Sequence, residues 1–168
     1  SNIKKKGVND FFEVASLCST NSNIQFNLYG PITDEVKKVQ KELNTKNVKV
    51  HGYVTDVNVV MQQNHVVLSL SLFEESFGRT VAEGMLNERV VVAYDWGAVP
   101  ELLDEKSGIL VEYKNVKAVA DALCYLQKNN EILFKKAKNA RNRALSRFSN
   151  DVYNLQLKET LETFLNKS

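Results

Sequence analysis

Short apolar runs and amphipathic stretches alternate along most of the chain. Continuous or alternating apolar runs of about four to eight residues are typical of strands, whereas apolar residues spaced three and four apart are typical of helices. The sequence therefore predicts strands at residues 24–29, 48–54, 65–71, 90–94 and 108–111. It predicts helices at residues 8–19, 33–43, 55–63, 78–87, 99–103, 116–128, 131–147 and 150–165.

Turn and capping residues separate these elements. Gly30 and Pro31 end the first strand, and Thr33 and Asp56 are suited to begin the helices that follow. Strands that alternate with helices form βαβ units. The sequence thus predicts an α/β fold, with a Rossmann-like parallel sheet covered by helices on both faces. We expect residues 1–168 to form one domain, with the strand at 65–71 buried on both faces.

Composition narrows the possible function. The chain has 168 residues, of which 43% are hydrophobic and 25% charged, as in a folded domain. Its 22 basic and 20 acidic residues give a net charge of +2, so composition offers no case for a nucleic-acid partner. Cys18 and Cys124 fall in predicted helices, which favours free thiols in a reducing compartment. No apolar run approaches the length of a membrane span, and no signal peptide is evident at the start. We therefore expect a cytoplasmic protein.

The two histidines do not indicate a metal site. His51 precedes a glycine at a strand end, and His65 opens a strand. His51 is expected to have a structural or ligand-adjacent role and not a catalytic one, and His65 has no second ligand at metal-binding spacing. We expect no metal and no bound cofactor. Trp96 has two open interpretations, a packing role or a place in the wall of a ligand pocket.

The segment at residues 69–83 is the best candidate for a binding site. It passes from a strand, through a turn that holds a glycine and carboxylates, into a helix. Ligands of parallel α/β sheets bind outside the carboxyl ends of the strands. Free N–H groups from Gly78 to Val81 would point out of the helix start, where the helix dipole favours an anion such as a phosphate.

The helix after this turn is expected to have two different sides. Thr80, Glu83 and Asn87 share its polar side by helical spacing. The packed side is expected to carry Val81, Ala82, Met85 and Leu86. A carboxylate near a phosphate is useful where it accepts hydrogen bonds from hydroxyl groups. Spacing leaves open whether Glu83 does so or is a solvated surface residue. It also leaves open whether Glu75 is a ligand or a partner of the helix dipole.

Three sequence segments resemble the C-terminal domain of family-4 retaining glycosyltransferases, which have the two-domain GT-B architecture. They are ESFGRTVAEGM at 75–85, VVVAYDWGAVPELL at 90–103 and SGILV at 107–111. The family's characteristic pair of glutamates, with seven residues between them, corresponds to Glu75 and Glu83. Similarity continues at Lys6-Gly7-Val8, Tyr29-Gly30-Pro31 and Gly52-Tyr53-Val54. It covers nearly the whole chain and is strongest between residues 66 and 112.

The resemblance implies a nucleotide-sugar donor site. Lys6 and Glu75 would be the catalytic residues, with Lys6 neutralising the donor diphosphate and Glu75 accepting hydrogen bonds from sugar hydroxyls. Glu83 would bind the ribose hydroxyls, and Val54 would form a wall for the base. Backbone groups would contact the sugar at Ser76, Phe77 and Gly78, and the phosphates at Arg79, Thr80 and Val81.

The implied activity is retaining transfer of a hexose from a UDP- or GDP-linked donor to a hydroxyl of a glycan, polysaccharide or glycolipid. No metal is needed where lysine and backbone dipoles stabilise the leaving diphosphate. An N-terminal domain would hold the acceptor. We expect residues 1–168 to be a fragment without that domain and without the first strand of its own sheet, and therefore to be inactive alone. The alternative function is a non-catalytic α/β module that binds a nucleotide or sugar or regulates another protein.

Other features qualify the resemblance. The family has an arginine where this chain has Ser1, and usually two glycines where it has Gly97-Ala98.

Residues 128–147 hold seven basic side chains and one acidic side chain. Such a run is mostly a solvated helix face. The secondary interpretation is peripheral contact with anionic lipids at the inner face of the plasma membrane.

Overall fold

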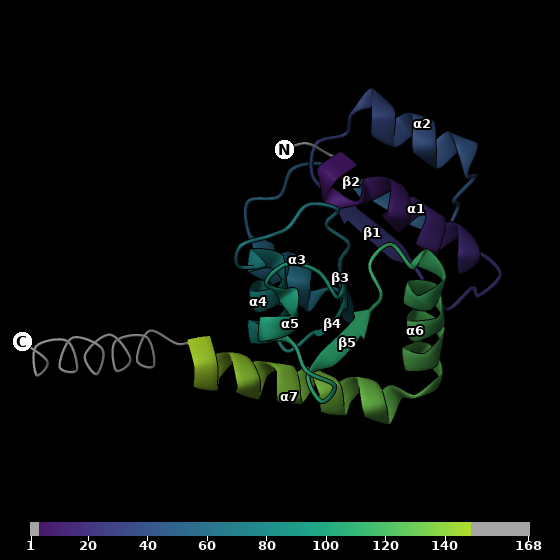
Figure 1. Cartoon of the computed structure of the whole chain (residues 1–168). Helices are drawn as coiled ribbons and strands as arrows, with labels where there is room; N and C mark the ends of the chain where they lie inside the picture. The colour runs from purple at the N-terminus through teal and green to yellow at the C-terminus, as the bar shows by residue number, and fades with distance from the viewer. Residues whose placement is uncertain (1–3, 149–168) are drawn as a thin grey trace, which may run out of the picture.

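The computed structural model describes residues 4–148, and the predicted helix at 150–165 lies outside them (Figure 1). This part of the chain has five strands: β1 Phe26–Tyr29, β2 Val48–His51, β3 Val66–Ser69, β4 Val90–Tyr94 and β5 Gly108–Val111. Its helices are η1 Lys4–Lys6, α1 Val8–Leu17, α2 Asp34–Glu42, α3 Val57–Gln62, α4 Arg79–Leu86, α5 Val99–Leu102, α6 Val116–Lys128 and α7 Asn130–Phe148. The predicted order of strands and helices is confirmed, although β1, β2 and β3 are shorter than expected.

Two predicted capping residues begin their helices. Thr33 Oγ1 accepts a hydrogen bond from the Val36 N–H (3.3 Å) at the start of α2. Asp56 Oδ1 accepts one from the Asn58 N–H (2.9 Å) at the start of α3. These contacts satisfy N–H groups that have no partner within the helix, which explains why the two helices begin there.

All paired strands are parallel, as predicted, but backbone hydrogen bonds divide them into two sheets. β1 pairs with β2, with Phe26 opposite Val48. The second sheet has the order β3-β4-β5, with Val66 opposite Val90 and Val91 opposite Gly108.

β4 lies at the centre of the core, and all five of its residues are buried. Successive side chains of a strand point to opposite faces. Val90, Val92 and Tyr94 accordingly pack in one apolar cluster with residues of α1 and α6. Val91 and Ala93 pack in a second cluster with residues of α4, α5 and α7. Helices therefore cover both faces of this sheet, as the sequence predicted.

Burial of β3 is less complete than predicted. Val67 and Ser69 are buried, whereas Val66 and Leu68 are half-buried. These two half-buried side chains line a cavity between β3 and β1. The expectation that β3 is buried on both faces is therefore wrong.

The loop between α5 and β5 is held by Asp104. Its Oδ1 accepts hydrogen bonds from the Ser107 hydroxyl (2.7 Å) and the Ser107 N–H (2.9 Å), and Arg143 of α7 lies 2.9 Å from Oδ2. The hydrogen bond from the Ser107 side chain, supported by the charge of Arg143, holds the pKa of Asp104 below its ordinary value of 3.8.

We expect Asp104→Asn to lower the free energy of unfolding by about 1 kcal/mol at pH 7. A depressed carboxyl pKa stabilises the fold above the unfolded-state pKa, and this contribution is lost as pH falls through the folded-state pKa. The difference from the unsubstituted chain should therefore shrink toward pH 3. Urea unfolding at both pH values measures it. Asp121→Asn, which removes an exposed pair with Lys117, serves as the control and should cost less than about 0.5 kcal/mol. An Asp104→Asn loss of equal size at both pH values would contradict the role of its charge.

Candidate functional site

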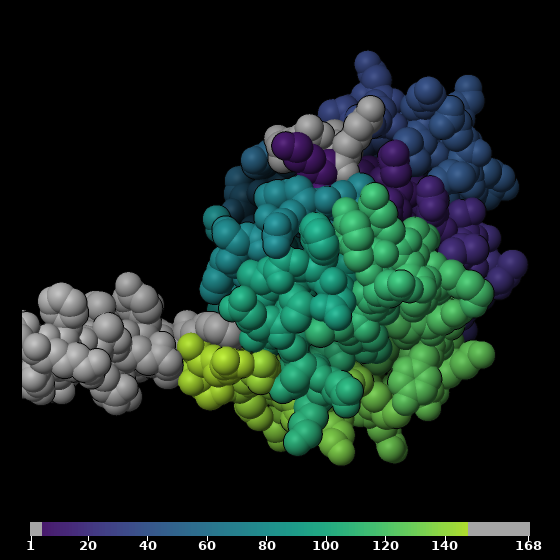
Figure 2. Space-filling view, in the orientation of Figure 1, coloured from purple at the N-terminus to yellow at the C-terminus, as the bar shows by residue number. Residues whose placement is uncertain are grey.

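The N-terminal segment and the loop after β3 form one side of the candidate site, although more than 60 positions separate them in the sequence. The Leu72 N–H donates to the Lys5 carbonyl (2.8 Å), and the Ser71 hydroxyl lies 3.3 Å from the same oxygen. Gly7 has a left-handed φ of 71° and packs against the backbone of Leu70. In Figure 2 the purple N-terminal residues lie on the surface, next to the teal part of the chain. These contacts on either side of Lys6 fix the position of its backbone next to the loop after β3.

Lys6 and Glu75 form an ion pair at this junction. Lys6 Nζ lies 2.6 Å from Glu75 Oε1, with 47% of the lysine side chain and 14% of the glutamate side chain exposed. The same Nζ is 4.8 Å from the centre of the Phe73 ring. The structure thus brings together the two residues to which the resemblance assigned catalysis. It also leaves the cation accessible to an incoming anion.

Gly97 packs closely against the backbone of Glu75. Gly97 has a φ of 61°, and a Cβ there would lie 2.9 Å from both the N and the O of Glu75. The next residue, Ala98, donates its N–H to the Glu75 carbonyl (3.0 Å). The first of the family's two glycines is therefore required by close packing. Ala98 still supplies the backbone donor.

Trp96 packs against a neighbouring aromatic residue. Its ring is stacked on Tyr113, with ring centres 4.5 Å apart and planes 18° apart. Tyr113 donates its hydroxyl hydrogen to the Leu72 carbonyl (2.9 Å). This stack connects the end of β4 to the loop after β3. Of the two interpretations left open by the sequence, the structure shows the packing role.

The start of α4 offers fewer free amides than predicted. Gly78 adopts a left-handed conformation before the helix, with φ 73°. Its carbonyl accepts hydrogen bonds from the N–H groups of Val81 (2.9 Å) and Ala82 (3.1 Å). The prediction that the Val81 N–H is free for a phosphate is therefore wrong. Within residues 4–148, the N–H groups of Gly78, Arg79 and Thr80 have no backbone acceptor, so these three stay available for an anion.

Glu83 follows one turn later on α4. Its side chain is 28% exposed, and Arg79 Nε donates to its Oε1 at 2.8 Å. Val81, Ala82 and Met85 are buried on the opposite side as predicted, but Leu86 is 39% exposed. The prediction for Leu86 is wrong because the packed stripe of this short helix includes Gly84, which lies against Val67 and Val91.

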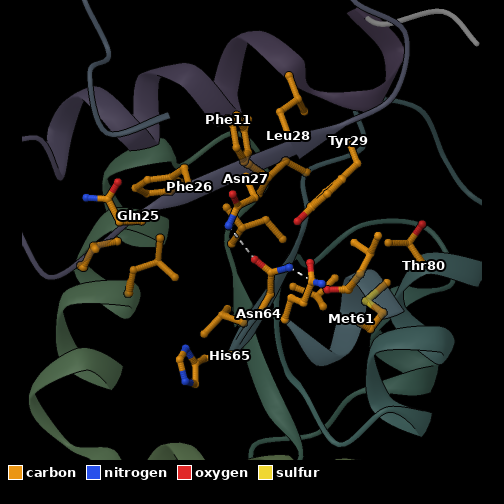
Figure 3. Close-up of a pocket in the computed structure, with 18 of the residues that line it drawn as sticks. Phe11, Gln25, Phe26, Asn27, Leu28, Tyr29, Met61, Asn64, His65 and Thr80 are labelled. Atoms are coloured by element: carbon orange, nitrogen blue, oxygen red, sulfur yellow. Dashed lines mark hydrogen bonds between the residues drawn. The ribbon is translucent and has the colours of Figure 1, made fainter. Parts of the chain in front are cut away.

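Two cavities adjoin these residues. Lys6, Glu75 and Thr80 line a smaller cavity of about 270 Å³. A larger one, of about 1100 Å³, has Lys6, Val54, Thr80 and Glu83 among its lining residues, and Figure 3 shows Thr80 at its edge. Ser76 and Phe77 lie on the exposed turn before α4 and line neither cavity. Val54, proposed as a wall for the base, thus shares a cavity with Glu83.

Sequence reasoning gave no role to Tyr29, which lines both cavities. Its ring is stacked on His51, with centres 4.5 Å apart, and His51 Nε2 is hydrogen-bonded to Asn27 Oδ1 (2.9 Å). His51 is therefore used in packing, one of the roles expected for it. The sequence feature that could have indicated this role is the position of Tyr29 at the end of a predicted strand, directly before Gly30.

Several basic side chains of α7 are used inside the fold. Lys136 donates to the Gly108 carbonyl (3.2 Å), Arg141 to that of Leu86 (2.9 Å) and Arg143 to that of Leu102 (2.6 Å). The expectation of a mostly solvated basic face holds for Arg141 and the other exposed basic residues of this run, whereas Lys136 and Arg143 are half-buried. Within residues 4–148, no helix is both long and apolar enough to cross a bilayer.

Comparison with known proteins gives consistent matches. Residues 1–129 match a family model described as glycosyl transferases group 1. The chain is 28% identical over 155 residues to a poly(ribitol-phosphate) alpha-N-acetylglucosaminyltransferase of Staphylococcus aureus (strain COL), covering 89% of this chain and 31% of that protein.

Two solved structures also match nearly the whole chain. Anabaena Alr3699/HepE in complex with UDP superimposes with a TM-score of 0.87 at 25% identity, over 95% of this chain and 46% of that one. A variant of S. aureus TarM in complex with fondaparinux, alpha-GlcNAc-glycerol and UDP superimposes with a TM-score of 0.79 at 28% identity, over 96% and 32% of the two chains. The chain therefore spans 31% to 46% of the length of these proteins.

Proposed function

The chain belongs to the group 1 glycosyl transferases, and we propose that it is the part of such an enzyme that binds the nucleotide-sugar donor. The observation that carries this proposal is the contact between Lys6 and Glu75, 2.6 Å apart beside the start of α4. A cation, free helix amides and a partly buried carboxylate together suit a ligand that has both phosphates and hydroxyl groups.

Charge sets the orientation of the donor. The diphosphate belongs with Lys6 and the amides of Arg79 and Thr80, where positive charge and the helix dipole add. An ionised carboxylate repels phosphate but accepts hydrogen bonds from hydroxyl groups. The transferred sugar therefore lies at Glu75, and the ribose at Glu83. The base then extends toward Val54, which lines the same larger cavity as Glu83.

Binding requires the existing ion pairs to rearrange. In the ligand-free chain, Lys6 is paired with Glu75, and Arg79 is paired with Glu83. A diphosphate competes for Lys6 because it carries more negative charge than one carboxylate. Release of Lys6 leaves the oxygens of Glu75 free for the sugar hydroxyls. Because Arg79 is 84% exposed, its pair with Glu83 is weak and easily displaced.

The reaction proposed is retaining transfer of a hexose. As the bond between sugar and diphosphate breaks, negative charge develops on the leaving phosphate oxygen. Lys6 and the start of α4 stabilise this charge. The leaving phosphate can then accept the proton of the attacking hydroxyl group. This arrangement needs no metal ion.

We propose UDP-linked over GDP-linked donors, since the Anabaena neighbour is named in complex with UDP and with UDP-glucose. A hydroxyl group of a cell-made polymer is supported as the acceptor by the S. aureus relative, whose name specifies poly(ribitol-phosphate), a polyol phosphate chain. The acceptor would be held by a second domain outside residues 1–168. Peripheral membrane contact is supported only by the basic residues at 128–147 and stays a prediction.

We expect the isolated chain to bind UDP with a Kd below 1 mM, and to transfer little or no sugar. Calorimetric titration with UDP, GDP and ADP measures the affinity and the preference for a base. Lys6→Ala should weaken UDP and inorganic pyrophosphate alike, because both ligands depend on the charge of this residue. Lys117→Ala, on the exposed side of α6, is the matched control and should change neither. Absence of binding by all three nucleotides at millimolar concentration would contradict the proposal.

A further inference from the structure

Phe73 is a large apolar side chain beside the candidate site to which the proposed function gives no role. The residue is 39% exposed, although the neighbouring Leu72 packs against the apolar cluster that contains Tyr94. A phenylalanine in such an exposed position buries little apolar area and adds little stability by packing. Lys6 Nζ lies 4.8 Å from the centre of its ring. That separation is within the range of about 6 Å over which the face of an aromatic ring attracts a cation.

The backbone around Phe73 is fixed by hydrogen bonds from three parts of the chain. The Leu72 N–H donates to the Lys5 carbonyl (2.8 Å). Tyr113, which follows β5, donates its hydroxyl hydrogen to the Leu72 carbonyl (2.9 Å). The Ser71 hydroxyl lies 3.2 Å from the Phe73 carbonyl. Because the peptide groups on both sides of Phe73 are bonded in this way, its ring extends from a defined point of the loop.

The side chain of Lys6 is less restrained. It is 47% exposed, and a lysine side chain has among the largest rotamer entropies of any residue. In the ligand-free chain its pair with Glu75 (2.6 Å) orders it. A diphosphate that draws Lys6 away from Glu75 removes this restraint at the moment when the ammonium group has to be in place.

The contact with the ring survives such an exchange. An aromatic face carries no net charge, so an incoming phosphate has no anion to displace from it. For the same reason the ring leaves the full positive charge of Lys6 available to the ligand, whereas the carboxylate of Glu75 neutralises it. Phe73 can therefore order Lys6 both before and after the ligand arrives.

We propose that Phe73 is a positioning residue, which holds the ammonium group of Lys6 against its ring while Lys6 exchanges Glu75 for the diphosphate of the donor. This inference rests on the proposed function, since it concerns the ligand of Lys6. The ring restricts the rotamers of Lys6 in advance, which reduces the entropy lost on binding. Phe73 acts through Lys6 and needs no contact of its own with the phosphates.

Substitution of the ring is the first test. Phe73→Leu keeps an apolar side chain and should weaken both UDP and inorganic pyrophosphate by about two- to fivefold, the range of a cation–π contact at an exposed site. Phe73→Trp, which restores an aromatic face, should recover the affinity. Tyr125→Leu is the matched control, because it removes a ring that is 47% exposed on α6, and should change neither affinity. Calorimetric titration measures these affinities.

Two further variants separate a cation–π contact from an apolar packing role. Fluorine atoms on the ring of Phe73 withdraw electron density from its face, while the ring keeps nearly the same size and becomes more apolar. With one, two and three ring fluorines, the affinity for pyrophosphate should fall stepwise, whereas a packing role predicts no fall. In the Lys6→Ala chain, Phe73→Leu should cause no further loss, because the effect of the ring passes through Lys6.

NMR observes the contact itself. Protons above the face of an aromatic ring are shifted upfield by its ring current. The ε-methylene protons of Lys6 should therefore lie upfield of those of Lys117, whose side chain is 78% exposed. Phe73→Leu should abolish this difference. Saturating pyrophosphate should preserve it, because Lys6 changes its anionic partner and keeps its ring.

Equal affinities of the Phe73→Leu and unsubstituted chains would overturn the inference and leave the donor site intact. A loss of the same size in the Lys6→Ala chain would also overturn it, since Phe73 would then act on the fold and not through Lys6. So would an upfield shift that disappears when pyrophosphate binds. Absence of binding of both UDP and pyrophosphate by the unsubstituted chain would instead contradict the proposed function, and this inference with it.

Discussion

Glu83→Ala is expected to weaken UDP binding by about 10- to 100-fold and to leave inorganic pyrophosphate binding unchanged or slightly tighter. Hydrogen bonds to a charged acceptor contribute about 1.5–3 kcal/mol each, which sets this range. Pyrophosphate has no ribose and does not use Glu83. It gains from the substitution, because Arg79 loses the carboxylate that lies 2.8 Å from its Nε. Calorimetric titration of both ligands measures the two effects.

Two variants make this experiment specific. Glu131→Ala removes the same charge from an exposed position in the first turn of α7, and should leave both affinities unchanged. Glu83→Gln keeps one acceptor oxygen and should lose less affinity for UDP than Glu83→Ala. Equal weakening of UDP and pyrophosphate by Glu83→Ala would show that Glu83 supports the start of α4 instead of binding the ribose.

Gly7→Ala should give the largest loss of stability, about 3–4 kcal/mol. A Cβ at this position would lie 1.8 Å from the Leu70 carbonyl oxygen and 2.7 Å from its carbon. Both atoms are backbone, so rotation of a side chain cannot relieve the clash. The left-handed φ of 71° adds a further cost of about 1–2 kcal/mol. Since Lys6 is the adjacent residue, UDP binding should fall as well.

Urea unfolding followed by circular dichroism measures the change in stability. Gly52→Ala is the matched control, because no atom lies within 4 Å of its added Cβ. It should change the free energy of unfolding by less than about 0.5 kcal/mol. A Gly7→Ala chain as stable as the original would mean that the contact between Gly7 and Leu70 is absent in solution.

Much of the local structure was predictable from the sequence. The apolar run at 90–94 became β4, and Thr33 and Asp56 became helix caps. Strand periodicity and capping depend on residues only a few positions apart, so a single sequence contains the necessary information. The parallel pairing followed from the alternation of strands and helices.

Details of burial were less predictable. Leu86 has the spacing of a packed residue but is exposed, because α4 is short and Gly84 takes the position nearest the sheet. The N–H of Val81 looked free by its place in the helix, but it reaches back to the Gly78 carbonyl. The basic run on α7 looked solvated, yet Arg143 reaches the Leu102 carbonyl. These outcomes depend on neighbours that are distant in the sequence or on the local geometry of one turn.

The sequence by itself determined the strands and helices, their order and parallel pairing, and the resemblance that drew attention to Lys6, Glu75 and Glu83. Only the tertiary structure decided that Lys6 and Glu75 meet at 2.6 Å, and that a gap lies between β1 and β3. The reason is the range of the interactions. Local elements follow from sterics and hydrogen bonds between near neighbours. A contact across 69 positions exists because the backbone at Gly7 packs against Leu70, which brings together two segments that sequence spacing does not relate.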